Sequence, residues 1–148
     1  MRIRQPRILP ATEADWTDLS RPGITPYVQS KTVAERAARD WVAREGAGLS
    51  FCAICPSVVL GPVWGPDYSA SVGVVQKLLD GSLRATPDFG FGVVDVRDVA
   101  DLHVRALTAP GMDGERFIAS GRFMKLREVA EVLCTALGPQ ADRVTTRN

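Results

Sequence analysis

The 148-residue sequence predicts an α/β protein with a doubly wound parallel sheet. Short apolar segments of strand length alternate with segments of helical periodicity from the middle of the chain onward. The segment from Leu49 to Ile54 is apolar on both faces, which is typical of a parallel strand covered by helices on both sides. Sheets of this kind usually contain about five or six strands, whereas three segments here have strand patterns. We therefore expect an incomplete sheet whose missing strands belong on the N-terminal side.

Residues 1–22 show no periodicity and contain three prolines, so we expect an irregular N-terminal segment ahead of one domain over residues 23–148. A first helix begins at Thr25 and Pro26, because threonine is a good N-cap and proline fits the first helical position. This helix ends near Glu45, where Gly46 supplies a stop.

The remaining elements follow from the same patterns. After the strand over 49–54, a loop rich in glycine and proline is expected from Pro56 to Asp67. The elements expected after it are a helix over 71–79, a short strand over 92–96, a helix over 97–107, a short strand over 116–119 and a helix over 126–137.

The charge balance excludes several classes of function. The 18 basic and 17 acidic residues leave a net charge of +1, so no strong field attracts nucleic acid or an anionic membrane. No apolar run reaches the roughly 18 residues of a membrane span, and no apolar signal core follows the first residues. We expect a cytoplasmic protein.

The cysteines and the single histidine favour structural roles. Cys52 and Cys55 form a C-x-x-C, but residues three apart in a strand point to opposite faces and cannot share a metal. Cys134 falls on a predicted helical core position, where free cysteine packs as a small hydrophobe. His103 falls within a clear helical pattern, so a helix-surface histidine is expected and no metal site is predicted.

No glycine-rich phosphate loop occurs in the sequence. Neither G-x-G-x-x-G nor a Walker-type pattern is present, and Gly90-Phe-Gly-Val-Val-Asp leads into a strand instead of a helix. Nucleotide binding by this chain alone therefore has no support from its motifs.

Tyr27 and Lys31 form a pair with catalytic chemistry. They are four residues apart on the first predicted helix and share a face. A neighbouring ammonium favours the phenolate, which suits tyrosine for acid–base work. Two unit charges about 5 Å apart interact by roughly 0.8 kcal/mol in water and roughly 3.3 kcal/mol at an effective dielectric of 20. The pair therefore needs a covered site, and spacing alone favours a surface pair.

Several segments in a fixed order resemble the extended short-chain dehydrogenase/reductases, most closely the dihydroflavonol-4-reductase-like branch. The resemblance covers roughly residues 12–137 and corresponds to the C-terminal half of a Rossmann-like domain with a small substrate lobe. The segments that carry it are Thr12-Glu-Ala-Asp-Trp-Thr-Asp, Tyr27-Val-Gln-Ser-Lys with its continuation Thr32-Val-Ala-Glu-Arg-Ala-Ala, Cys55-Pro-Ser-Val-Val-Leu-Gly-Pro, Phe91-Gly-Val-Val-Asp-Val-Arg-Asp-Val-Ala-Asp-Leu-His-Val and Gly114-Glu-Arg-Phe-Ile-Ala-Ser.

The resemblance implies an oxidoreduction between a carbonyl compound and an alcohol with NADP or NAD. Tyr27 would be the proton donor, and Lys31 would hold the nicotinamide ribose and assist Tyr27. The residues implied at the nicotinamide end are Pro56, Ser57 and Val58, and those implied in the substrate pocket are Val59, Tyr68, Ser71, Val72 and Phe91.

The sequence also departs from the family. The glycine-rich first half is absent, and no serine precedes Ser20, so the upstream catalytic serine has no counterpart. We therefore expect little reductase activity from the chain alone, and two hypotheses follow. The first is a reductase fragment whose partner is an N-terminal half or a second copy. The second is a non-catalytic domain that binds a ligand or associates with itself.

Overall fold

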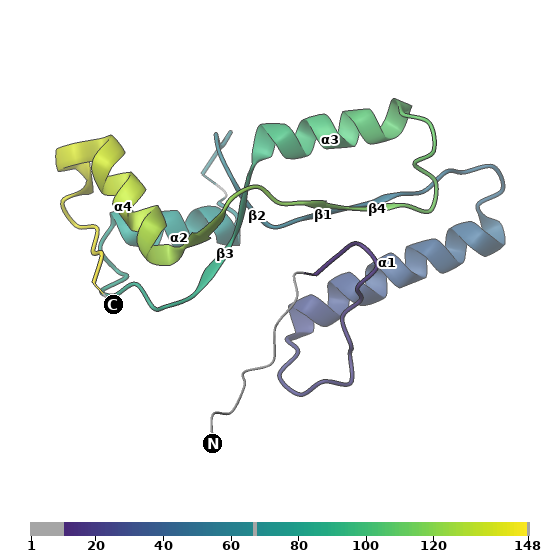
Figure 1. Cartoon of the computed structure of the whole chain (residues 1–148), viewed down its shortest axis with the longest axis horizontal. Helices are drawn as coiled ribbons and strands as arrows, with labels where there is room; N and C mark the ends of the chain where they lie inside the picture. The colour runs from purple at the N-terminus through teal and green to yellow at the C-terminus, as the bar shows by residue number, and fades with distance from the viewer. Residues whose placement is uncertain (1–10, 67, 148) are drawn as a thin grey trace, which may run out of the picture. The chain divides into compact units, whose positions relative to one another are not determined.

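The computed structural model describes residues 11–66 and 68–147, so the first part of the predicted irregular segment lies outside the described residues (Figure 1). The chain divides into two compact units, and each is described by itself. Unit 1 comprises Met1–Ala53 and Pro110–Ile118, and unit 2 comprises Ile54–Ala109 and Ala119–Asn148.

Unit 1 contains the helix α1, Pro26–Glu45. The Thr25 hydroxyl accepts a hydrogen bond from the Val28 N–H at 3.3 Å, and the Gly46 N–H donates to the Val42 carbonyl at 3.0 Å. Both predicted ends of this helix are therefore confirmed, and the cap and stop satisfy backbone groups that a helix end leaves unpaired.

Strands β1, Ala53–Pro56, and β4, Arg116–Ala119, pair in a two-stranded sheet. The Ala53 N–H donates to the Glu115 carbonyl, and the Ser57 N–H donates to the Ala119 carbonyl, each at 3.0 Å. The strand predicted from Leu49 to Ile54 therefore begins four residues later than expected. The reason is local: the Phe51 N–H donates to the Asp113 carboxylate at 2.8 Å instead of to a neighbouring strand.

Unit 2 contains a three-stranded sheet in the order β2-β3-β5, with β2 at Val58–Leu60, β3 at Gly90–Asp95 and β5 at Phe123–Lys125. β2 and β3 are parallel with Val59 opposite Val94, whereas β3 and β5 are antiparallel with Phe91 opposite Met124. β2 lies inside the segment predicted as loop, and β5 was not predicted. Each is only three residues long, too short to carry a periodic pattern.

Three helices of unit 2 have bounds within two residues of the predictions: α2 at Ala70–Leu79, α3 at Val96–Thr108 and α4 at Leu126–Leu137, followed by the 3-10 helix η1 at Gly138–Ala141. The core of this unit lies between α2 and α4 and consists of the buried side chains of Leu78, Leu126, Val129 and Ala130.

The glycines of the Gly90-Phe91-Gly92 segment have a packing role. A Cβ added at Gly90 would lie 2.7 Å from the Met124 carbonyl oxygen and 2.6 Å from the Phe123 ring, because β5 passes directly against β3 there. This close approach explains glycines that otherwise resemble part of a phosphate loop. Among the described helices, none combines the length and apolar composition that a membrane span requires.

Candidate active site

Tyr27 and Lys31 lie on the same face of α1, in its first two turns. The Lys31 Nζ lies 5.4 Å from the centroid of the Tyr27 ring, over its face. The expected juxtaposition of the two side chains is therefore present. Tyr27 is 70% exposed.

The two hydroxyl residues beside this pair serve the helix itself. The Ser30 hydroxyl donates to the Tyr27 carbonyl at 2.7 Å, and the Thr32 hydroxyl donates to the Val28 carbonyl at 3.0 Å. Both bonds link a side chain to the preceding turn of α1, as serine and threonine commonly do inside helices. Tyr27 and Lys31 are therefore the side chains of this turn that remain available for chemistry.

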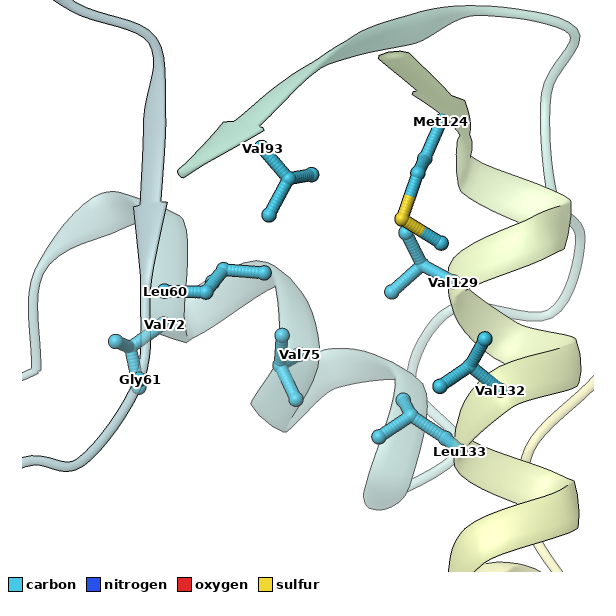
Figure 2. A pocket seen from close by; sticks show the side chains of 9 residues that line it. All are labelled: Leu60, Gly61, Val72, Val75, Val93, Met124, Val129, Val132 and Leu133. Atoms are coloured by element: carbon cyan, nitrogen blue, oxygen red, sulfur yellow. The ribbon is translucent and has the colours of Figure 1, made fainter. Parts of the chain in front are cut away.

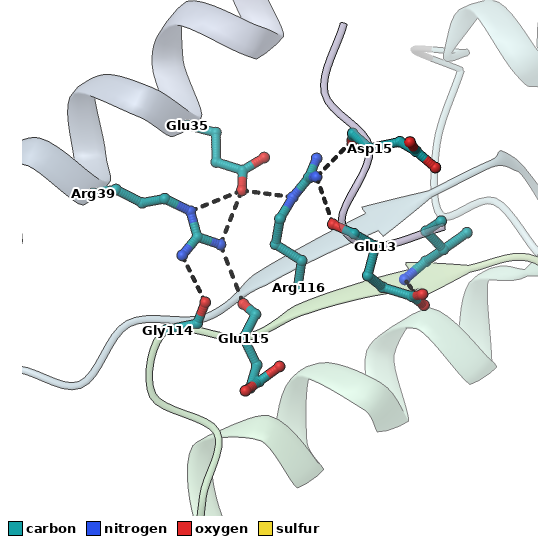
Figure 3. A network of polar contacts seen from close by, with 8 residues as sticks. Glu13, Asp15, Glu35, Arg39, Gly114, Glu115 and Arg116 are labelled. Atoms are coloured by element: carbon teal, nitrogen blue, oxygen red, sulfur yellow. Dashed lines mark hydrogen bonds and ion pairs between the residues drawn. The ribbon is translucent and has the colours of Figure 1, made fainter. Parts of the chain in front are cut away.

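A network of polar contacts fixes α1 within unit 1 (Figure 3). The Glu35 carboxylate accepts from Arg39 at 3.0 Å and forms an ion pair with the Arg116 Nε at 2.9 Å. Arg39 also donates to the Gly114 carbonyl at 2.8 Å and to the Glu115 carbonyl at 3.2 Å. The helix that carries Tyr27 is thereby joined to the turn before β4 and to β4 itself.

Arg116 extends the network to the segment before α1. Its Nη1 donates to the carbonyls of Glu13 and Asp15, each at 2.8 Å. Its guanidinium lies 4.1 Å from the centroid of the Trp16 ring, a distance at which a cation and an aromatic face attract. Residues 12–18 were identified from the sequence only through the family resemblance. Their contacts with Arg116 were not predicted, because contacts between residues far apart in the chain leave no local sequence pattern.

The residues implied at the nicotinamide end lie at the junction of β1 and β2 in unit 2. Pro56 ends β1 and Val58 begins β2. Between them, the Ser57 N–H donates to the Ala119 carbonyl at 3.0 Å, and its hydroxyl donates to the same carbonyl at 3.4 Å. The backbone of this short segment is therefore held rigidly next to the end of β4.

An apolar pocket of about 350 Å³ lies in unit 2 (Figure 2). Of the five residues implied in substrate binding, Val72 lines this pocket. Val59 lies on β2 next to Leu60, so strand alternation directs Leu60 and not Val59 toward it. Phe91 packs against the core of unit 2. The lining residues are Leu60, Gly61, Val72, Val75, Val93, Met124, Val129, Val132 and Leu133.

Sequence reasoning missed most of this lining. On α4, however, Val129, Val132 and Leu133 have the i, i+3, i+4 spacing of one apolar helix face, and this signal was available. The two remaining implied residues lie before and at the start of α2. Tyr68 is 45% exposed, and Ser71 lies in the first turn of the helix.

Among the described titratable groups of unit 2, Asp95 has the pKa that departs furthest from its usual value. It ends β3 and caps α3, and its carboxylate accepts from the Arg97 side chain at 2.6 and 2.8 Å and from the Arg97 N–H at 2.8 Å. The side-chain bonds, followed by the backbone bond, lower the pKa of Asp95 to about 2. This carboxylate therefore stabilises the start of α3 and is held away from proton-transfer chemistry.

The described residues contain no cluster of histidine, cysteine or acidic side chains that could hold a metal ion. No disulfide joins Cys52, Cys55 and Cys134, all three of which lie among the described residues. The His103 ring is exposed on α3, with its Nδ1 2.7 Å from the Val99 carbonyl oxygen, so it is the helix-surface histidine that the sequence predicts.

Comparisons with known proteins identify the family. No protein-family model matches the chain. Cinnamoyl-CoA reductase 1 of Arabidopsis thaliana is 36% identical over 123 residues, and the match covers 82% of this chain and 35% of that protein. Tetraketide alpha-pyrone reductase 2 of the same plant is 31% identical over 127 residues, which cover 84% of this chain and 38% of that protein.

The fold is similar to that of solved reductases. A yeast methylglyoxal/isovaleraldehyde reductase, solved in complex with NADPH, superposes with a TM-score of 0.71 at 23% identity over 82% of this chain and 38% of its own. The chain thus spans well under half the length of the proteins it matches, and the expected Rossmann-like α/β class is confirmed. By its sequence similarity to these relatives, the chain belongs to the extended short-chain dehydrogenase/reductase family.

Proposed function

We propose that the chain contributes the proton donor and the substrate lobe of an NAD(P)H-dependent reductase of carbonyl compounds. The observation that carries the proposal is the Tyr27–Lys31 pair, with the Lys31 Nζ 5.4 Å from the Tyr27 ring centroid in a Y-x-x-S-K frame. Relatives named as reductases, at 31% and 36% identity, support it.

In the proposed reaction, the Tyr27 hydroxyl donates its proton to the carbonyl oxygen of the substrate. The nicotinamide, when bound, supplies the hydride that reaches the carbonyl carbon, so that an alcohol and the oxidised cofactor result. Lys31 holds the ribose hydroxyls through its ammonium and stabilises the phenolate left on Tyr27. Both side chains are exposed and therefore accessible to ligands.

The backbone of Pro56, Ser57 and Val58 is the segment we assign to the nicotinamide end. Its position is fixed by two hydrogen bonds from Ser57 to the Ala119 carbonyl, which would present a rigid surface to a planar ring. Val59, Tyr68, Ser71, Val72 and Phe91 are the residues assigned to the substrate side. NADP and NAD are both compatible with these groups, and we assign no residue of this chain to the cofactor phosphates.

A chimera tests the catalytic roles. In it, residues 11–147 replace the matching part of a characterised reductase of this family, and NADPH oxidation is followed with a carbonyl substrate. Tyr27→Phe should lower kcat by about two to four orders of magnitude, the usual contribution of a general acid. Lys31→Met should raise the KM for NADPH, whereas Lys77→Met, at an exposed position of α2, should change neither kcat nor this KM. A Tyr27→Phe chimera with unchanged kcat would refute the proposal.

A non-catalytic ligand-binding or self-associating domain is the second candidate. The exposure of Tyr27 favours it, because a water-exposed pair stabilises a phenolate only weakly. Titration of the chain with NADPH and NADH, monitored by tryptophan fluorescence, tests whether the chain holds a cofactor site by itself. Saturable binding that Lys31→Met weakens supports the reductase, whereas no binding of either cofactor indicates a substrate-lobe fragment that needs an N-terminal partner. The chimera then separates the candidates, because a non-catalytic domain predicts that Tyr27→Phe leaves its kcat unchanged.

A further inference from the structure

The pocket of unit 2 has a uniform chemistry. Each of its nine lining residues is aliphatic, a methionine or a glycine, so no lining side chain carries an N–H or O–H donor or a charge (Figure 2). Eight of them come from five elements, β2, α2, β3, β5 and α4, and Gly61 directly follows β2. Such a surface favours ligands that need no hydrogen-bonding partner.

The walls of the pocket are two helices with matching apolar faces. Val72 and Val75 face it from α2 at i, i+3 spacing, and Val132 and Leu133 face it from α4 (Figure 2). Val129, on the same face of α4, belongs both to the lining and to the buried core. The pocket is therefore a continuation of the core that opens to the surface between the helices, where Val132 is 54% exposed.

The volume sets the size of the ligand. A pocket of about 350 Å³ has the volume of about a dozen water molecules, because each water occupies roughly 30 Å³ in the liquid. An aromatic ring with a short chain, or a branched aliphatic chain of about a dozen non-hydrogen atoms, has this size. An apolar pocket holds such groups better than it holds water, which requires two to four polar partners.

The charged side chains described next to the pocket are paired with one another. A neighbouring depression, which shares Met124 and Val132 with the pocket, includes Arg122 and Glu128. The Arg122 guanidinium is paired with the Glu128 carboxylate at 3.3 Å, and both side chains are exposed. A sugar or a carboxylate placed in the pocket would lose its hydration without compensation, at a cost of about 1–3 kcal/mol for each unsatisfied polar group.

We propose that this pocket binds an uncharged apolar group of a small organic ligand. The assignment of that group to the carbonyl substrate rests on the proposed reductase function: the group would be the non-reacting aromatic or branched aliphatic part of the substrate. The pocket selects against sugars and other polyhydroxylated carbonyl compounds.

Binding to the chain without any cofactor tests this inference separately from the reductase function. Benzylacetone, an aromatic ketone of suitable size, is the apolar probe, and glucose is the polar probe of similar size. Both are titrated by calorimetry and by NMR of the valine and leucine methyl groups. Benzylacetone should bind saturably and shift methyl signals of pocket residues, and glucose should not.

Two matched variants localise the binding. Val132→Asp places a carboxylate on the wall of the pocket and should weaken benzylacetone binding at least about tenfold, equivalent to about 1.4 kcal/mol. Val104→Asp makes the same change on α3, where the valine is 62% exposed and outside the pocket, and should leave the Kd within about twofold. Val75→Phe, which fills the pocket from α2, should also abolish binding without adding a charge.

Three results would overturn the inference: no saturable binding of benzylacetone, equal binding of glucose, or equal effects of Val132→Asp and Val104→Asp. None of these results depends on Tyr27 or on NADPH. Failure here with an active chimera would therefore leave the reductase function intact and reject only the apolar substrate class.

Discussion

Replacing Arg116 with alanine should release α1 from the rest of unit 1. The Arg116 side chain is 18% exposed and its partner Glu35 is 14% exposed, so their ion pair is largely shielded from water. Removing one member of a buried pair typically costs about 3–5 kcal/mol, because the other charge stays buried without a partner. The cation–aromatic contact with Trp16 and the bonds to the Glu13 and Asp15 carbonyls disappear as well.

The size of the effect follows from two corrections. The pair keeps some contact with water, which reduces the cost, and Arg39 continues to pair with Glu35 at 3.0 Å, which reduces it further. We therefore expect a loss of about 3 kcal/mol, at the lower end of the range for buried pairs. Among the described residues of unit 1, only Thr32 and Gly46 are buried, so little apolar burial is available to compensate.

Hydrogen exchange of the α1 amides measures this loss directly. At about 1.4 kcal/mol for each factor of ten, 3 kcal/mol corresponds to exchange about a hundredfold faster when opening limits protection. Arg105→Ala is the control, because Arg105 forms an i, i+4 pair with Asp101 in which both side chains are more than half exposed. That variant should leave α1 exchange unchanged. Equal exchange in Arg116→Ala and Arg105→Ala would refute the reasoning.

Three further predictions follow. Gly90→Ala should destabilise the chain by about 1–3 kcal/mol in urea unfolding, because the new Cβ meets backbone of β5 at 2.7 Å. Gly73→Ala, inside α2 with open space around it, should instead stabilise by about 0.5–1 kcal/mol, and the reverse order would contradict the packing argument. Carboxyl NMR should give Asp95 a midpoint at about pH 2, since Arg97 lowers its pKa from 3.8; its contribution to stability is fully present above pH 3.8 and is lost as the pH falls through about 2, and a midpoint at 3.8 would exclude the bond. The chain should self-associate at micromolar concentration in light scattering, and Trp41→Ser, which removes a 46% exposed tryptophan from α1, should weaken this association; a monomer would count against it.

The elements predicted well are those with strong local signals. α1 begins at Thr25 and Pro26, and α4 has both of its predicted ends, because capping residues and apolar periodicity act within a few positions. β2 and β5 were missed because a three-residue strand is defined by its partner. Met124 pairs with Phe91, which is far away in the sequence, and no local pattern predicts such a pairing.

The candidate site likewise combines local features that the sequence predicts with long-range contacts that it does not predict. The proximity of Tyr27 and Lys31 was predictable, since i, i+4 side chains on a helix are neighbours. The pocket was not predictable as a whole, because it needs Leu60 from β2, Val75 from α2 and Val132 from α4 at one place. The family resemblance named Val72, which lines this pocket, and Val59, which lies beside the lining residue Leu60 on β2; a motif does not record which face of a strand a residue occupies.

The exposure of Tyr27 determines how the proposed chemistry must work. At 70% exposure, the phenolate and the Lys31 ammonium interact through water, at roughly 0.8 kcal/mol for charges about 5 Å apart. Covering the pair raises that value to roughly 3.3 kcal/mol at an effective dielectric of 20, a difference of nearly a hundredfold in an equilibrium constant. The nicotinamide and the substrate are the groups that would cover the pair in the proposed reductase. Proton donation by Tyr27 should therefore become efficient only in the complex with both, and Lys31→Met should reduce the rate more in that complex than it weakens the binding of either ligand alone.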